Sequence, residues 1–175
     1  MVDVSNWTIK EMQRCAGNGY RVGYPDTTMG DLLLYLVEAM GELACITPLS
    51  RQKKLGSDDD SKFAFRNALG WVLLHLLAYC EWVGIDAEDH WSWAERQMEK
   101  QKADVSLSTA VRHLAFHVGM LVALGDTSLN KDSLVGNVLV GLHLVARKVD
   151  GDLSECMREM LSSSLVRPAT KEAQP

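Results

Sequence analysis

The amino-acid sequence predicts an all-α protein, folded as one compact helical bundle. Two long segments, 31–46 (DLLLYLVEAMGELACI) and 63–86 (FAFRNALGWVLLHLLAYCEWVGID), repeat their apolar residues at steps of three and four, as the buried faces of helices do. No segment alternates apolar and polar residues in the way of a half-buried strand. The segment 63–86 is apolar nearly all round, so we expect it to lie at the centre of the bundle.

Residues typical of helix ends divide the chain into elements. Side chains that cap helix starts stand at Ser5, Thr27 or Thr28, Ser61, Asp86, Ser106 or Ser108, Asp132 and Asp152. Residues that end helices stand at Gly17 and Gly19, Pro48, Gly84, Gly125 and Gly151. The first predicted helix is therefore short, over 7–15, and the last one ends near Leu161.

Two polar segments are predicted to lie outside the helices. Residues 50–60 (SRQKKLGSDDD) are interpreted as a solvated loop, and the alternative is that Arg51, Lys53 and Lys54 bind an anion. The C-terminal residues 166–175 are expected to be disordered.

Composition and charge narrow the classes of function. The 175 residues have a net charge of −5 and no basic stripe, which argues against binding to a nucleic acid duplex. The 4 cysteines form no C-x-x-C pair, so a zinc cluster is not expected, and they are interpreted as core residues in a reducing compartment. The N-terminus lacks the pattern of a signal peptide, and no uncharged apolar run reaches the roughly 18 residues of a membrane span. We therefore expect a cytoplasmic protein without a membrane segment.

The chain contains a weak internal sequence repeat, which predicts two structurally related halves. Residues 70–86 align without a gap on residues 136–152, and residues 34–45 align on residues 112–123. The matched pairs are Gly70 with Gly136, Leu76 with Leu142, Asp86 with Asp152, Leu36 with Leu114, Gly41 with Gly119 and Leu43 with Leu121. We expect one repeat in residues 1–104 and a more degenerate one in residues 105–165, related by a pseudo-twofold axis. Such a fused pair could be monomeric or could form a homo-oligomer.

The order of these segments resembles the MazG-like, all-α nucleoside triphosphate pyrophosphohydrolases, a group that includes the dimeric dUTPases. The matching stretches are LLLYLVEAMGELA and ALGWVLLHLLAYCEWVGID, within about residues 6–100, with a weaker copy over about 107–162. The resemblance implies paired helical hairpins. It also implies acids on two helices that hold Mg²⁺, with water attacking the α–β phosphate linkage to release pyrophosphate and the monophosphate.

Carried over residue by residue, the acid pattern of that family is mostly absent. Glu38 and Glu42 stand at two acid positions of the first helix, but Ala39 stands at the third, and the acids of the next helix fall on Ala68 and Trp71. In the second copy the corresponding positions hold Phe116, His117, Met120, Leu134 and Asn137. The resemblance therefore implies the fold and not the metal chemistry, and no cofactor is expected.

Three functions remain open. The first is a non-catalytic protein that binds a nucleotide-like ligand or a protein partner through Glu38, Glu42, Trp71, Lys53 and Lys54. The second is an active, divalent-metal-dependent pyrophosphohydrolase, with Mg²⁺ on Glu38 and Glu42 in a reduced site or a shifted one that uses acids of 58–60. The third is a structural or interaction module, in which the tryptophan-bearing helix is the contact surface and the two glutamates are hydrated acids.

Two further sets of side chains have alternative interpretations. His113 and His117 lie one helical turn apart, and with His143 they could chelate a transition metal or simply be packed histidines. Stacking on a base or burial in the core are the alternatives for the tryptophans Trp71, Trp82, Trp91 and Trp93.

Overall fold

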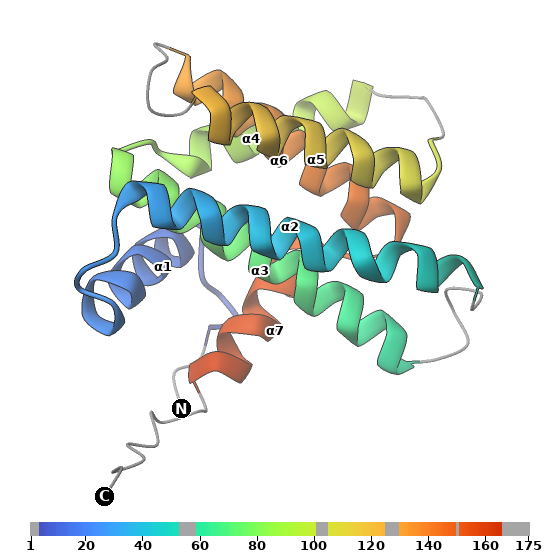
Figure 1. Cartoon of the computed structure of the whole chain (residues 1–175), viewed down its shortest axis with the longest axis horizontal. Coiled ribbons are helices and arrows are strands. Elements are labelled where there is room, and N and C mark those ends of the chain that lie inside the picture. Colours follow the sequence, from blue (N-terminus) through green and yellow to red (C-terminus); the bar gives the residue numbers. More distant parts are fainter. Residues whose placement is uncertain (1–3, 53–58, 101–104, 125–129, 150, 166–175) are drawn as a thin grey trace, which may run out of the picture.

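The computed structural model describes residues 4–52, 59–100, 105–124, 130–149 and 151–165, which form seven helices and no strand (Figure 1). The predicted all-α class is therefore confirmed for this part of the chain. In order, the helices are α1 (Ile9–Gly23), α2 (Met29–Gln52), α3 (Asp59–Val83), α4 (Ala87–Lys100), α5 (Leu107–Leu124), α6 (Lys131–Lys148) and α7 (Leu153–Leu165).

Helix α3 lies at the centre of the bundle, as its nearly all-round apolar sequence predicts. It packs against α1, α2, α6 and α7. Its fully buried residues are Leu69, Val72, Leu73, Leu76, Leu77, Ala78, Tyr79 and Cys80. Burial of one such leucine stabilises a fold by about 2 kcal/mol, so this one helix supplies much of the hydrophobic free energy.

The bundle contains two helical hairpins, α2–α3 and α5–α6, and the helix that follows each hairpin in the chain packs on the other hairpin. Helix α2 packs on α3 and α5 packs on α6, and α2 also packs on α5. Helix α4 follows α3 in the chain but packs on α6, and α7 follows α6 but packs on α3 (Figure 1). The ion pairs of Arg66 in α3 with Glu155 and Glu159 in α7, at 3.3 and 2.7 Å, lie along the second of these contacts.

The first helix differs from its prediction at both ends. It begins at Ile9 rather than residue 7, because Thr8 and Glu11 form a reciprocal capping box. It also runs through Gly17 and Gly19 to Gly23. A Cβ atom at position 17 would lie 2.3 Å from Cγ of Glu81 in α3. Gly17 therefore allows α1 to approach α3 and does not end the helix.

The two long helices extend into the segment predicted to be a loop. Helix α2 continues past Pro48 to Gln52. The fixed φ of proline, about −65°, is compatible with a helix, although a proline inside a helix removes one backbone hydrogen bond and its ring crowds the preceding turn. Helix α3 begins at Asp59, so Ser61 is not its cap. The prediction of a loop over 50–60 is wrong at both of its ends. Residues 53–58 lie outside the described residues, as does the tail 166–175.

Most other predicted helix ends are confirmed. Carboxylate or hydroxyl oxygens of Thr28, Asp86, Ser106 and Asp152 accept hydrogen bonds from first-turn amides of α2, α4, α5 and α7. Gly84 follows α3 with a φ of +76°, a left-handed conformation that glycine adopts without strain. Asp132 is not the cap of α6, which begins one residue earlier at Lys131.

Two segments, Lys62–Val83 and Leu107–Leu124, are long and apolar enough to cross a membrane by length and composition. The first belongs to the core helix α3 and is 67% buried, whereas the second is α5 and is 28% buried. The absence of a membrane span stays a prediction. Cys80 and Cys156 are buried free thiols, as predicted for core residues, but Cys45 is exposed.

Candidate functional site: the pocket between α2 and α3

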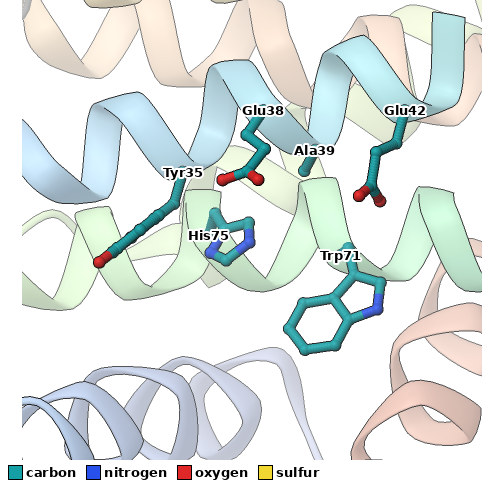
Figure 2. Close-up of a pocket in the computed structure, with 6 residues that line it drawn as sticks. All are labelled: Tyr35, Glu38, Ala39, Glu42, Trp71 and His75. Carbon is teal, nitrogen blue, oxygen red and sulfur yellow. The ribbon is translucent and has the colours of Figure 1, made fainter.

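A pocket of about 330 Å³ lies between α2 and α3. It is lined by Tyr35, Glu38, Ala39, Glu42, Trp71 and His75. Figure 2 shows the glutamate side chains reaching from α2 toward α3, where the tryptophan and histidine rings lie. The structure thus brings together three of the five residues that the sequence indicated as candidate ligand-binding residues, Glu38, Glu42 and Trp71.

The two glutamates lie on the same face of α2 because residues four apart in a helix are one turn apart. Both side chains are exposed, so their carboxylates remain hydrated. Across the pocket, α3 contributes no acid: Ala68 is buried, and Trp71 is half-buried and lines the pocket.

Aromatic rings form the inner wall of the pocket. The rings of Trp71 and His75 are stacked, with centroids 5.7 Å apart and planes at 26°. Tyr35 lies on the other side of the histidine, with ring centroids 5.9 Å apart. Behind it Tyr20 of α1 stacks on Tyr35 at 5.8 Å. Four rings from three helices therefore form one continuous surface.

His75 is the buried polar group of this wall, with 8% of its surface exposed. Its Nδ1 lies 2.6 Å from the hydroxyl of Tyr20. Its Nε2 has no hydrogen-bond partner among the residues that the structure describes. Burial lowers the pKa of His75 to about 4, so the ring is neutral at pH 7. Burial also raises the pKa of Tyr20, which keeps its phenol protonated.

The buried histidine makes the fold sensitive to acid. The pKa of His75 is about 4 in the folded protein and 6.5 for an ordinary histidine, so between these values the unfolded chain binds a proton that the folded chain does not. The contribution of neutral His75 to the free energy of unfolding is fully present well above pH 6.5 and falls as the pH drops toward 4. We expect a loss of about 1.5 kcal/mol between pH 6.5 and pH 5 from this group.

Urea unfolding of the wild type and of His75→Gln at several pH values measures this contribution. The variant should show a shallower fall of stability over that window, although it is less stable at pH 7. His113→Gln, which replaces an exposed histidine of α5, should follow the wild type. Parallel pH profiles for the wild type and His75→Gln would contradict the prediction.

The side chains of the remaining predicted ligands lie outside the part of the chain that the structure describes. Lys53, Lys54 and Asp58 lie outside the described residues. Arg51 belongs to α2, and Asp59 and Asp60 belong to α3, with side chains that are likewise not described.

The three histidines considered as a metal site are not brought together. His113 and His117 are neighbours on α5, with ring centroids 4.5 Å apart, but His143 of α6 packs edge-on against Trp91 of α4. Among the described residues, no three His, Cys, Asp or Glu side chains are close enough to hold a metal ion. Burial lowers the pKa values of His117 and His143.

Of the four tryptophans considered for stacking, only Trp71 lines the pocket between α2 and α3. Trp91 is buried, and the half-buried Trp82 ring lies 5.8 Å from the guanidinium carbon of Arg21. Trp93 lines a second pocket of about 420 Å³ between α4 and α6, with Asp89, His90, Asp132, Ser133 and Gly136. There, Nε2 of His90 lies 3.6 Å from a carboxylate oxygen of Asp132.

Sequence reasoning missed three residues of the aromatic wall, Tyr20, Tyr35 and His75. A signal for two of them exists: Tyr35 precedes Glu38 by three residues and His75 follows Trp71 by four, so each shares a helix face with a predicted site residue. Tyr20 gives no such signal, because its position depends on how α1 packs against α3.

Comparisons with known proteins leave the family of the chain open. No family model matches the sequence, and neither a curated protein nor a solved structure shows significant similarity to it.

Proposed function

We propose that this chain is a MazG-like tandem helical protein that binds a small ligand in the α2–α3 pocket without hydrolysing it. The observation that carries the proposal is the convergence of Glu38, Glu42 and Trp71 on one pocket with the buried His75. The sequence left a nucleotide-like ligand or a protein partner open, and the lining of this pocket suits the base of the former better than its phosphates.

The packing of the helices supports a pseudo-twofold relation between the halves. Exchanging α2 with α5, α3 with α6 and α4 with α7 maps the main contacts among these six helices onto one another, whereas the small α6–α7 contact has no comparable α3–α4 counterpart. The α2–α3 and α5–α6 contacts exchange, and the α3–α7 contact becomes the α6–α4 contact. The α2–α5 and α3–α6 contacts map onto themselves. Helix α1, which packs on α3 and α4, has no counterpart in this exchange.

The aligned glycines give the same relation at the level of single residues. A Cβ on Gly70 would lie 2.8 Å from the carbonyl oxygen of Cys156 in α7, and one on Gly136 would lie 3.1 Å from the Trp93 ring and 3.7 Å from Nδ1 of His90, both in α4. The offset that aligns Gly70 with Gly136 also aligns His90 with Cys156. Both glycines therefore lie where the exchanged helix crosses.

The side chains facing the pocket support binding without hydrolysis. Mg²⁺ prefers a near-octahedral set of oxygen ligands, which the family supplies from two helices. Among the residues that line this pocket only those of α2 include acids, and the α3 positions where the family has acids hold Ala68 and Trp71. The aromatic wall instead offers surface for stacking, which stabilises binding and requires no metal.

Two measurements on the full chain test the proposal. The first is pyrophosphate release from a panel of nucleoside triphosphates with Mg²⁺ or Mn²⁺, for which we expect no activity above that of Glu42→Ala. The second is a ligand-observed NMR screen of a small-molecule library. We expect ligands whose binding is lost in Trp71→Ala and kept in Trp93→Ala, a matched change in the other pocket.

The alternative functions predict different results. Pyrophosphate release that Glu42→Ala abolishes would establish an active hydrolase and overturn the proposal. Absence of any ligand that depends on Trp71 would also overturn it, and a stable protein complex from lysate would then favour an interaction module.

A further inference from the structure

The lining of the α2–α3 pocket combines negative charge with aromatic faces. Glu38 and Glu42 are its two ionisable acids, and none of its six lining residues is Lys or Arg. A free phosphate group entering this pocket would be repelled by both carboxylates and would find no cationic partner among its lining residues. A positively charged ligand would be attracted.

The rings of the pocket also favour a cation over a neutral ligand. The face of an aromatic ring is electronegative, and Trp attracts a cation most strongly, with Tyr next. Trp71 and Tyr35 flank His75 on the wall of the pocket. Because His75 is neutral, it adds a ring without adding a positive charge that would oppose the ligand.

The unpaired nitrogen of His75 offers one directed contact. In a neutral imidazole one ring nitrogen carries the proton and the other accepts. When Nδ1–H donates to the oxygen of Tyr20, Nε2 has a free lone pair and can accept a hydrogen bond from an ammonium group. When the hydroxyl of Tyr20 donates to Nδ1, Nε2–H can donate to a ligand hydroxyl. In either tautomer Nε2 of His75 offers the ligand one directed hydrogen bond.

We infer that the α2–α3 pocket binds a small aliphatic ammonium ion, whose alkyl groups pack against Trp71 and Tyr35 while its charge faces Glu38 and Glu42. This inference rests on the proposed function, since it names the ligand class of the same site. The volume of about 330 Å³ suits a ligand of this size and is at the small end of known ligand pockets.

Isothermal titration calorimetry with defined amines tests the inference on the full chain. The probes are choline and 1,4-diaminobutane, with 3,3-dimethyl-1-butanol as the neutral isostere of choline. We expect either amine to bind at least tenfold more tightly than the neutral alcohol. The affinity should fall as salt rises, because the attraction to exposed carboxylates is screened.

Variants separate the charge from the fold. Glu38→Gln/Glu42→Gln should weaken amine binding at least tenfold and leave the affinity for the alcohol unchanged. Glu99→Gln, an exposed glutamate on α4, serves as the matched control and should bind like the wild type. Circular dichroism melts show whether each variant remains folded, and Tyr35→Phe, which keeps the ring, should retain binding.

The outcomes distinguish the inference from the proposed function. Equal binding of choline and its neutral isostere, or amine binding unaffected by the double glutamate change, would overturn the inference. If neither amine binds but other ligands from the screen depend on Trp71, the inference fails and the proposed function stands. If no ligand depends on Trp71, both fail.

Discussion

Replacing Gly70 with leucine is expected to lower the free energy of unfolding by about 3 kcal/mol, because it forces α7 away from α3. A Cβ at this position would lie 2.8 Å from the carbonyl oxygen of Cys156 and 3.0 Å from Cβ of Met160. The first of these atoms belongs to the backbone, which cannot turn aside as a side chain can. Cys156, Met157 and Met160, now buried, would become partly exposed.

Gly41→Leu is the matched control for this change. Gly41 is also a helical glycine, but a Cβ there meets nothing within 4 Å. Leucine has a higher helix propensity than glycine by about 0.8 kcal/mol, so this variant should be as stable as the wild type or slightly more stable. Urea unfolding followed by circular dichroism measures both. Similar stabilities for the two variants would show that α7 does not lie against Gly70.

Replacing Gln13 with leucine is the second change with a large expected effect. The side-chain amide of Gln13 donates to the carbonyl oxygen of Ile85 at 2.9 Å and to Glu81 at 3.1 Å. Its oxygen accepts from the buried backbone N–H of Ala87 at 2.9 Å. Leucine has a similar volume but leaves both backbone groups unpaired at the α3–α4 turn. Each unpaired buried group costs about 1–3 kcal/mol, so we expect a loss of about 3 kcal/mol.

Asn18→Leu provides the comparison, because Asn18 lies on the exposed side of the same helix. It should change the stability by less than about 0.5 kcal/mol. Amide hydrogen exchange adds a local measurement: in Gln13→Leu the N–H of Ala87 should exchange much faster, while amides in the middle of α6 change only with global stability. Unchanged protection of Ala87 would contradict the assigned hydrogen bond.

The sequence predicted the features of this fold that depend on neighbours along the chain. Apolar periodicity identified the long helices, and the caps at Asp86 and Asp152 were predictable because a capping side chain bonds amides two or three residues away. The central place of α3 followed from its lack of a polar face. The four-residue spacing of Glu38 and Glu42 predicted that they lie on one face of their helix.

The features that the sequence did not predict depend on contacts between distant segments. Gly17 reads as a helix end until the approach of α1 to α3 is known. In the sequence His75 is one polar residue in an apolar run, and its hydrogen bond with Tyr20 of α1 is visible only in the fold. Helix α2 extends to Gln52 and α3 begins at Asp59, so the helix-end signals at Pro48 and Ser61 did not locate the ends of these two helices.

The packing of α4 and α7 on the opposite hairpins also affects how the protein unfolds. The helix that follows each hairpin in the chain packs on the other hairpin, so unfolding of either hairpin exposes part of the other. A substitution that destabilises one half is therefore expected to destabilise the other half as well. The two halves are therefore expected to unfold together as long as Gly70 and Gly136 keep the helix crossings free of side chains.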